Sequence, residues 1–412
     1  MNLFWKHRIF PVMLLYFIFT PVLSGAQSAN EAYNRGLQFM AANDYSAAIE
    51  RFDEAIDILP YFHEAYFERG RCHQHLNEFE KSINDFNQAI KHHEEFPDAF
   101  YFRGLSHSAI GKHDEALKDY TQAINLNPLH TQAYLKRSEI HIRNSDIKNA
   151  LYDLKNVIEM GHKNPNVYLS RGKLYEKKGK PEKALEDFSN ALELDSLHAE
   201  LRYERGLVFI QLEKFKEAAK DLNIAIEQGI NSQQTHQLRA DANFMAGNFP
   251  EAAHDYTTLI NTYRQRNEET HLNRALSYFY AEEYDAAIRD LTRVTGLNRN
   301  NETAYIYRAR SFYQIGREAQ AGDDYRVAIS LNPQNAMAYE CRGMMHLEDG
   351  NIIDAIEDLN KAVDLNPSAD NFYRRAMAHA ANENHQMACD DLKKAVELGH
   401  ETAKELSEEY CR

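Results

Sequence analysis

Cysteine is scarce in this sequence, with four residues among 412. No two of them have the C-x-x-C spacing of zinc or thioredoxin-like sites, and four are too few for a disulfide scaffold. Cys389 and Cys411 are equidistant from His400, beside a glycine where a helix is expected to reverse. An antiparallel hairpin that turns there places both sulfur atoms at one height. In an oxidising compartment we expect these two to form a disulfide, and we expect Cys72 and Cys341 to be buried or half-buried.

Catalytic signatures are also absent. The sequence has no H-E-x-x-H, no G-x-S-x-G, no Walker glycine loop and no G-x-G-x-x-G. The densest groups of possible ligands are Cys72 and His73 with His75, and residues 92–95, all in segments predicted to be helical. Adjacent helical residues point about 100 degrees apart and do not easily share a metal ion. We therefore expect a chain that is not an enzyme and that binds no metal, cofactor or small-molecule substrate.

Basic residues are outnumbered. Lys and Arg total 47 against 62 Asp and Glu, a formal net charge of -15. An acidic surface repels the phosphate groups of nucleic acids and anionic lipids, which argues against both as partners. Basic or neutral proteins and peptides fit this charge better.

Residues 1–26 have the features of a secretory signal peptide. Lys6 and Arg8 precede an apolar run over residues 9–23, and small residues then precede Gln27. The run is short for a membrane span, and two prolines interrupt it. We expect cleavage before Gln27 and export across the inner membrane of a bacterium, to the periplasm or beyond the cell. The alternative is an uncleaved N-terminal anchor, the one case in which we expect membrane association.

The main feature that is present is an internal repeat. Small residues recur 34 positions apart for the first seven units, and then at steps of 35, 34, 34 and 33. The residues in this series are Gly36, Gly70, Gly104, Ser138, Gly172, Gly206, Ala240, Ala275, Ala309, Gly343 and Ala376. Eleven units therefore fill residues 29–400.

Each unit has two segments with the apolar spacing of helices, separated by a turn that is often marked by Gly or Asn. This pattern predicts a helical hairpin. No segment has the alternating apolar and polar residues that are typical of a β-strand. Glycine within a helix costs about 1 kcal/mol relative to alanine, so the small position indicates close approach of the paired helix. A large residue recurs sixteen positions later, at Phe52, Phe86, Tyr120, Leu154, Phe188, Leu222, Tyr256, Leu291, Tyr325, Leu359 and Leu392.

These spacings resemble the tetratricopeptide repeat family. One unit shows the pattern at Tyr168, Gly172, Tyr175, Ala184, Phe188 and Ala191. The resemblance implies an all-α, right-handed superhelical solenoid of about eleven hairpins, with first helices that line a concave groove. We divide it into units 1–7 over residues 27–264, units 8–11 over 265–400 and a capping helix over 401–412. The boundary is placed where units seven and eight depart most from the pattern, and we expect a looser interface near residues 255–275.

Charges also recur. Arg precedes the small residue in all eleven units, and Asp follows on the second helix in ten of them. A charge repeated beside packed small residues predicts a structural ladder of ion pairs between helices. Representative members are Arg69, Arg103 and Arg171 on the first helices and Asp85, Asp119 and Asp187 on the second helices.

Large apolar residues near the recurring arginine are the candidates for a protein-binding groove. In the first six units these are Tyr33, Phe67, Tyr101, Leu135, Leu169 and Tyr203. The alternative is that several of these side chains are interior. Such a groove favours an extended apolar or basic segment of another protein. The sequence thus predicts a scaffold or adaptor of the cell envelope, or alternatively a periplasmic chaperone for unfolded or extended clients.

Overall fold

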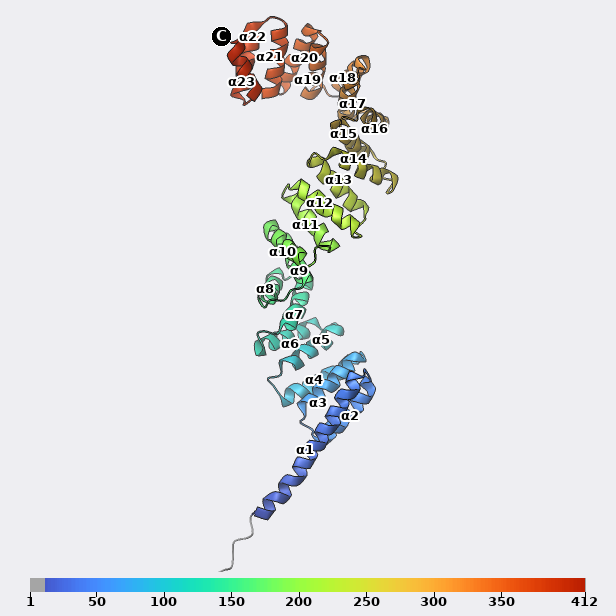
Figure 1. Ribbon diagram of the computed structural model, residues 1–412, viewed down its shortest axis with the longest axis vertical. Coiled ribbons are helices and arrows are strands. Elements are labelled where there is room, and N and C mark those ends of the chain that lie inside the picture. The colour runs from blue at the N-terminus through green and yellow to red at the C-terminus, as the bar shows by residue number, and fades with distance from the viewer. Residues whose placement is uncertain (1–11, 412) are drawn as a thin grey trace, which may run out of the picture. The chain divides into compact units, whose positions relative to one another are not determined.

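The computed structural model describes the backbone of residues 12–411, and the side chains of residues 25–408 and of Cys411. In this part of the chain all regular secondary structure is helical, in 23 helices, which confirms the predicted all-α class. The chain divides into two compact units, one ending at Ser196 and the other starting at Leu197. Figure 1 labels the helices of both units. The boundary predicted at residues 264/265 therefore lies inside the second unit, and the looser interface expected nearby stays a prediction.

The predicted signal peptide falls largely on residues whose side chains lie outside the described part of the chain. No helix within that part combines the length and the apolar character that a membrane span requires. Cleavage and export therefore stay predictions.

The first unit consists of consecutive helical hairpins. Its helices are α1 (Val12–Ala41), α2 (Tyr45–Ile58), α3 (His63–His75), α4 (Phe79–His92), α5 (Pro97–Ala109), α6 (His113–Leu126), α7 (Thr131–Arg143), α8 (Ile147–Glu159), α9 (Pro165–Lys177) and α10 (Pro181–Leu194).

The second unit continues the same pattern and ends with an added helix that covers the last hairpin. Its helices are α11 (Ala199–Gln211), α12 (Phe215–Glu227), α13 (Gln233–Met245), α14 (Phe249–Asn261), α15 (Glu268–Tyr280), α16 (Tyr284–Leu297), α17 (Glu302–Gln314), α18 (Glu318–Leu331), α19 (Ala336–Glu348), α20 (Ile352–Leu365), α21 (Ala369–Ala381), α22 (His385–Glu397) and α23 (Glu401–Tyr410). The last of these occupies the segment predicted as a capping helix.

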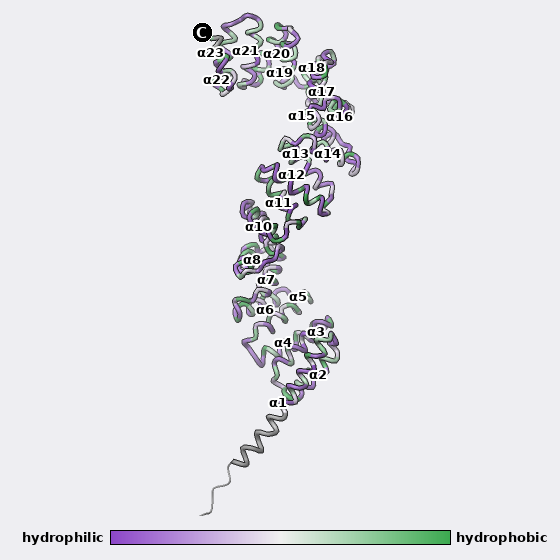
Figure 2. Tube along the Cα trace, in the orientation of Figure 1, coloured by the Kyte–Doolittle hydropathy of each residue, from purple (hydrophilic) through white to green (hydrophobic). Residues whose placement is uncertain are grey.

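Each hairpin turns on a residue in the left-handed region. The φ angle is 78° at Gly111 and 59° at Asn77, which occupies the equivalent turn of the preceding unit. Glycine adopts this conformation without steric cost and asparagine tolerates it, which explains why Gly and Asn mark these turns in the sequence. Figure 2 shows hydrophilic and hydrophobic residues alternating along the helices, as expected for helices with one packed face.

The recurring small and large residues pack directly on each other within one hairpin. A Cβ atom added at Gly104 would lie 2.6 Å from Cε1 of Tyr120, and one added at Gly70 would lie 2.9 Å from Cε1 of Phe86. Tyr120 and Phe86 are almost completely buried. The small residue is therefore required because one edge of the ring from the second helix lies directly against the first helix.

Gly104→Ala is expected to lower the free energy of unfolding by about 1–3 kcal/mol, because the ring of Tyr120 is almost completely buried and must shift to admit the added methyl group. Gly296→Ala is the matched control, since Gly296 lies near the end of α16 with no atom within 4 Å of an added Cβ. That substitution is expected to stabilise the chain by about 0.5 kcal/mol. Urea unfolding followed by circular dichroism measures both. If both substitutions change the free energy of unfolding equally, helix propensity accounts for the effect and packing against Tyr120 does not require a small residue at position 104.

Candidate protein-binding groove

The first helices of successive hairpins pack directly on one another. In the second unit α15 packs on α17, α17 on α19 and α19 on α21, while each second helix packs between its own first helix and the next one. The side chains of the first helices therefore share one face. On this face lies a groove of about 460 Å³. Its lining residues are Phe279, Tyr280, Glu282, Tyr284, Arg310, Tyr313, Gln314, Tyr325, Cys341, Met344, Met345, Glu348 and Arg374.

Aromatic and sulfur-containing side chains form much of the groove. Phe279, Tyr325 and Met345 are buried, whereas Tyr280 keeps 42% of its surface exposed. The hydroxyl groups of Tyr280 and Tyr307 are 2.8 Å apart, which fixes both rings. Burial, with a smaller contribution from Tyr280, raises the pKa of Tyr307 to about 12. The groove thus offers an apolar surface that is fixed in place before a partner binds.

Cys341 is the free thiol in this groove. It is only partly exposed, and burial raises the pKa of the thiol. The thiol group is therefore protonated at neutral pH and contributes to packing rather than to nucleophilic chemistry.

Two arginines from different hairpins also line the groove. The guanidinium of Arg310 lies 4.6 Å from the ring centre of Phe279 and 5.1 Å from that of Tyr307. Arg374 forms an ion pair with Glu340. Burial and the nearby charge of Arg310 lower the pKa of Arg374. The groove therefore holds two positive charges close enough to affect each other.

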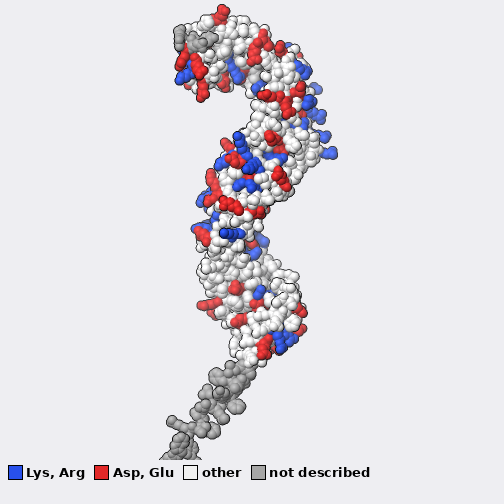
Figure 3. Space-filling view, in the orientation of Figure 1, with Lys and Arg blue, Asp and Glu red and all other residues white. Residues whose placement is uncertain are grey.

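Acidic residues line the edge of the groove where the first helices end. Glu348 is the last residue of α19, and Glu282 follows the end of α15. The hydroxyl of Tyr313 donates a hydrogen bond of 2.8 Å to Glu348, and burial together with this carboxylate raises the pKa of Tyr313. Figure 3 shows acidic and basic side chains interspersed on the visible surface of the second unit. The groove is therefore mixed in charge, with cations inside and carboxylates at one edge.

The residues predicted for the groove lie on the first helices, but they differ in exposure. Phe67 and Leu169 keep only 8% and 7% of their surface exposed, so the prediction that these side chains face a partner is wrong. Phe67 is interior because it packs on the ring of Phe96, with centroids 4.7 Å apart. The remaining four, Tyr33, Tyr101, Leu135 and Tyr203, are half-buried.

The ion-pair ladder is present in ten consecutive hairpins. Nε and Nη2 of Arg69 donate to the two carboxylate oxygens of Asp85 at 2.9 and 2.6 Å. Arg103 holds Asp119 in the same way at 3.0 and 2.6 Å. The remaining pairs are Arg137–Asp153, Arg171–Asp187, Arg205–Asp221, Arg239–Asp255, Arg274–Asp290, Arg308–Asp324, Arg342–Asp358 and Arg375–Asp391. The forked geometry fixes the register of the two helices in each hairpin.

Many of these arginines also make a second contact, which sequence reasoning missed. Nη1 of Arg103 donates to the side chain of Asn87 on α4 at 2.7 Å, and Nη1 of Arg137 donates to Thr121 on α6 at 3.1 Å. Each acceptor directly follows the large residue of the preceding hairpin. One guanidinium thus joins its own second helix to that of the hairpin before. The polar residue that recurs after the large one was the signal for this contact.

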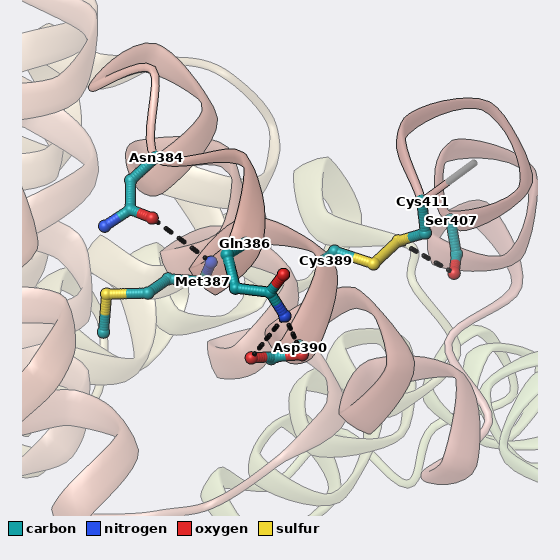
Figure 4. Close-up of a disulfide and its surroundings, with 7 residues drawn as sticks. All are labelled: Asn384, Gln386, Met387, Cys389, Asp390, Ser407 and Cys411. Atoms are coloured by element: carbon teal, nitrogen blue, oxygen red, sulfur yellow. Dashed lines mark hydrogen bonds between the residues drawn. A yellow bond between two sulfur atoms is a disulfide. The ribbon is translucent and has the colours of Figure 1, made fainter.

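Cys389 and Cys411 form a disulfide, with their Cα atoms 5.4 Å apart (Figure 4). The bond joins α22 to the end of α23, and the hydroxyl of Ser407 donates a hydrogen bond to Cys411. His400 caps α23, since its Nδ1 accepts a hydrogen bond of 3.1 Å from the backbone N–H of Ala403.

Among the residues that the structure describes, no group of three or more His, Cys, Asp or Glu side chains is placed to hold a metal ion.

Stacked two-helix units, joined by a repeated ion-pair ladder and presenting a groove on their first helices, define a helical-repeat protein. Sequence profiles of the tetratricopeptide repeat match residues 63–96, 97–129, 169–233 and 272–336. The chain belongs to the tetratricopeptide repeat proteins, whose repeats generally act as non-catalytic scaffolds for protein interactions.

Several solved structures have a similar fold. A tetratricopeptide repeat protein from Parabacteroides merdae is 22% identical, with a TM-score of 0.37 over 60% of this chain and 98% of that one. Yeast Tom70 is 14% identical, with a TM-score of 0.36 over 87% of this chain and 96% of that one. A structure of Naa15/Naa10 bound to HypK-THB is 13% identical, with a TM-score of 0.46; the match covers 93% of this chain and 65% of that one. No curated protein sequence is significantly similar to this chain.

Proposed function

We propose that this chain is a protein-interaction scaffold of the cell envelope, and that the groove of its second unit holds an extended segment of a partner protein. The observation that carries the proposal is the groove itself, where residues of four first helices combine an apolar floor with charged side chains over about 460 Å³. An extended segment suits this site because the lining of the groove continues across four successive first helices.

The proposed location has two supports. The N-terminal sequence has the pattern of an export signal, and the disulfide between Cys389 and Cys411 is a bond that persists in oxidising compartments. The acidic net charge fits partners that are proteins and disfavours nucleic acids.

A chaperone for extended clients is the second candidate. Met344 and Met345 both line the groove. Methionine side chains are flexible and adapt to different apolar partners, as at promiscuous binding surfaces. This observation favours a groove that accepts many sequences, whereas the fixed rings of Tyr280 and Tyr307 favour a dedicated partner.

Site-specific photocrosslinking tests the proposal. A benzoylphenylalanine is introduced at Gln314, an exposed residue of the groove, in the full chain expressed in its own cells. The same group at Arg293, which is exposed on α16 and does not line the groove, is the control. We expect crosslinked species in the envelope fraction from the Gln314 variant alone. One or a few species indicate a dedicated scaffold and a broad set indicates a chaperone, whereas equal crosslinking at both positions would refute the groove as the binding site.

A further inference from the structure

The second unit has another groove, formed mainly by second helices, and it shares no lining residue with the first groove. It encloses about 660 Å³. Helices α12 and α14 supply most of the lining, and α13 contributes two residues. The lining residues of this second-helix groove are Lys216, Ala219, Lys220, Asn223, Ile224, Arg239, Asn243, Asn248, Glu251, His254 and Asp255.

The second-helix groove has an excess of positive charge, although the chain as a whole is acidic. Its lining contains three cations and two carboxylates. Arg239 and Asp255 neutralise each other, because Nε and Nη2 of the arginine donate to the two carboxylate oxygens at 2.8 and 2.6 Å. Lys216 and Lys220 are exposed, and within the described residues neither forms an ion pair or a side-chain hydrogen bond. One positive charge therefore remains after Glu251 is counted.

This excess belongs to one place in the chain and does not follow from the repeat pattern. Five units earlier, Ser46 and Glu50 stand at the positions of Lys216 and Lys220. A further carboxylate, Asp53, lies on the same earlier helix where the later helix has an asparagine. The equivalent surface of the earlier repeats is therefore acidic, and the two lysines reverse its charge.

Asn243 is a buried amide with an unused donor. It keeps 6% of its surface exposed, and its Oδ1 accepts a hydrogen bond of 3.2 Å from Nδ2 of Asn248. Within the described part of the chain, Nδ2 of Asn243 makes no hydrogen bond of its own. At the equivalent position of the second repeat, Nδ1 of His73 contacts a carboxylate oxygen of Glu78 at 2.6 Å. A buried N–H without an acceptor is unfavourable, so an acceptor in the groove is stabilising.

The N-terminus of α14 opens on the same groove without a side-chain cap. Its N-cap residue, Asn248, and Glu251 of its first turn both line the groove. Asn248 makes no side-chain hydrogen bond to this helix, whereas Asn384, at the equivalent position of the last hairpin, accepts one from the backbone N–H of Met387. The first N–H groups of α14 are therefore left to an external acceptor, and a helix N-terminus carries about half a positive charge.

We infer that the second-helix groove binds a phosphate group, held by Lys216, Lys220 and the amide of Asn243 at the N-terminus of α14. The excess charge and the helix end together supply about 1.5 positive charges, close to the charge of about −1.5 to −2 on a phosphate monoester at neutral pH. Phosphate suits these donors better than carboxylate does. A planar carboxylate is best bound by a guanidinium, and each nitrogen of Arg239 already donates to Asp255 or to Asn223.

The acidic net charge of the chain is compatible with this site. It opposes long polyanions, which extend over much of the protein surface. A single phosphate group responds mainly to the charges within about 10 Å of it, because salt screens those farther away. The ligand is therefore the phosphate ion or a small phosphorylated molecule. The site is independent of the partner groove on the first helices.

A nuclear magnetic resonance titration of the full chain, with isotope-labelled asparagine, tests the inference. The side-chain amide signal of Asn243 is assigned by its loss in Asn243→Asp. The probes are inorganic phosphate, glycerol phosphate and acetate, at constant pH and ionic strength. We expect a saturable shift of this signal with both phosphates and at least about tenfold weaker binding of acetate. Tighter binding of glycerol phosphate assigns an organic phosphate, whereas equal or tighter binding of inorganic phosphate assigns the ion itself.

The double variant Lys216→Gln with Lys220→Gln is expected to weaken phosphate binding about tenfold or more, because two nearby positive charges are removed. The control is Lys361→Gln with Lys393→Gln, which removes the same charge from exposed residues of α20 and α22 outside the groove. Circular dichroism checks that both variants are folded. The inference is overturned by the absence of a saturable shift, by equal binding of acetate, or by the same change in affinity in both double variants.

Discussion

Asp187→Ala is expected to lower the free energy of unfolding by about 3 kcal/mol or more. Asp187 keeps 1% of its surface exposed, and both of its oxygens accept hydrogen bonds from Arg171. Within the described residues, Asp187 is the one carboxylate at ion-pair distance from Arg171. Its removal leaves a part-buried guanidinium, on a side chain that is 16% exposed, without any counter-ion, and the cost of that partly desolvated charge is the main part of the effect.

Asp85→Ala is the matched comparison. Arg69 has two carboxylates, because its Nη1 also contacts Asp53 of the preceding hairpin. The loss of Asp85 therefore leaves Arg69 with one partner, and we expect a smaller cost of about 2 kcal/mol, that of hydrogen bonds to a charged group. The difference between the two variants isolates the contribution of the second contact.

Urea unfolding measures the total effect in each variant, and hydrogen exchange shows where it is located. Protection is expected to fall in α9 and α10 for Asp187→Ala and less strongly in α3 and α4 for Asp85→Ala. Glu193→Ala removes the same charge from the exposed face of α10 and should leave stability unchanged within about 0.5 kcal/mol. A cost for Asp187→Ala no larger than that for Glu193→Ala would contradict a structural role of the ladder.

Features that repeat at a fixed spacing could be predicted from the sequence. The pairing of Gly104 with the second helix follows from the recurrence of small residues, and Arg103 with Asp119 follows from charges that repeat sixteen residues apart. The second contact of Arg103 with Asn87 was missed because the acceptor varies among Asp, Asn and Thr from unit to unit. Asp, Asn and Thr each offer a side-chain oxygen that can accept the hydrogen bond from the arginine. These residues are therefore equivalent as acceptors, although the sequence shows three different residue types.

The groove was harder to predict because the sequence does not distinguish a packed side chain from an exposed one on the same helix face. Phe67 was expected to face a partner, but the neighbouring first helix brings Phe96 and Phe102 onto it. The reverse case is Arg310, which directly follows the small residue of its unit, as Arg71 does. Arg71 donates a hydrogen bond to Glu68, whereas Tyr307 stands at the equivalent position before Arg310, so a search for similarity between units overlooks this difference.

Cys411→Ser is expected to release the last helix while the hairpins before it stay folded. The disulfide closes a loop with a sequence separation of 22, which corresponds to about 3 kcal/mol in the loop-entropy description. Without it, α23 is held by Ala403 and Leu406, which pack on Leu392 and Ala395 of α22. This contact is small, and the ten-residue helix is too short to be stable alone.

The effect is expected to be local, because each hairpin of a solenoid contacts only its neighbours and terminal repeats depend on a cap. Hydrogen exchange should increase strongly in α23 and moderately in α21 and α22, since loss of the cap exposes Leu392, which is otherwise 3% exposed. A reductant should produce the same change in the unchanged chain and no further change in Cys411→Ser. If the oxidised chain and Cys411→Ser exchange equally fast in α23, packing alone holds this helix in place. The disulfide then stabilises the protein only by restricting the unfolded chain.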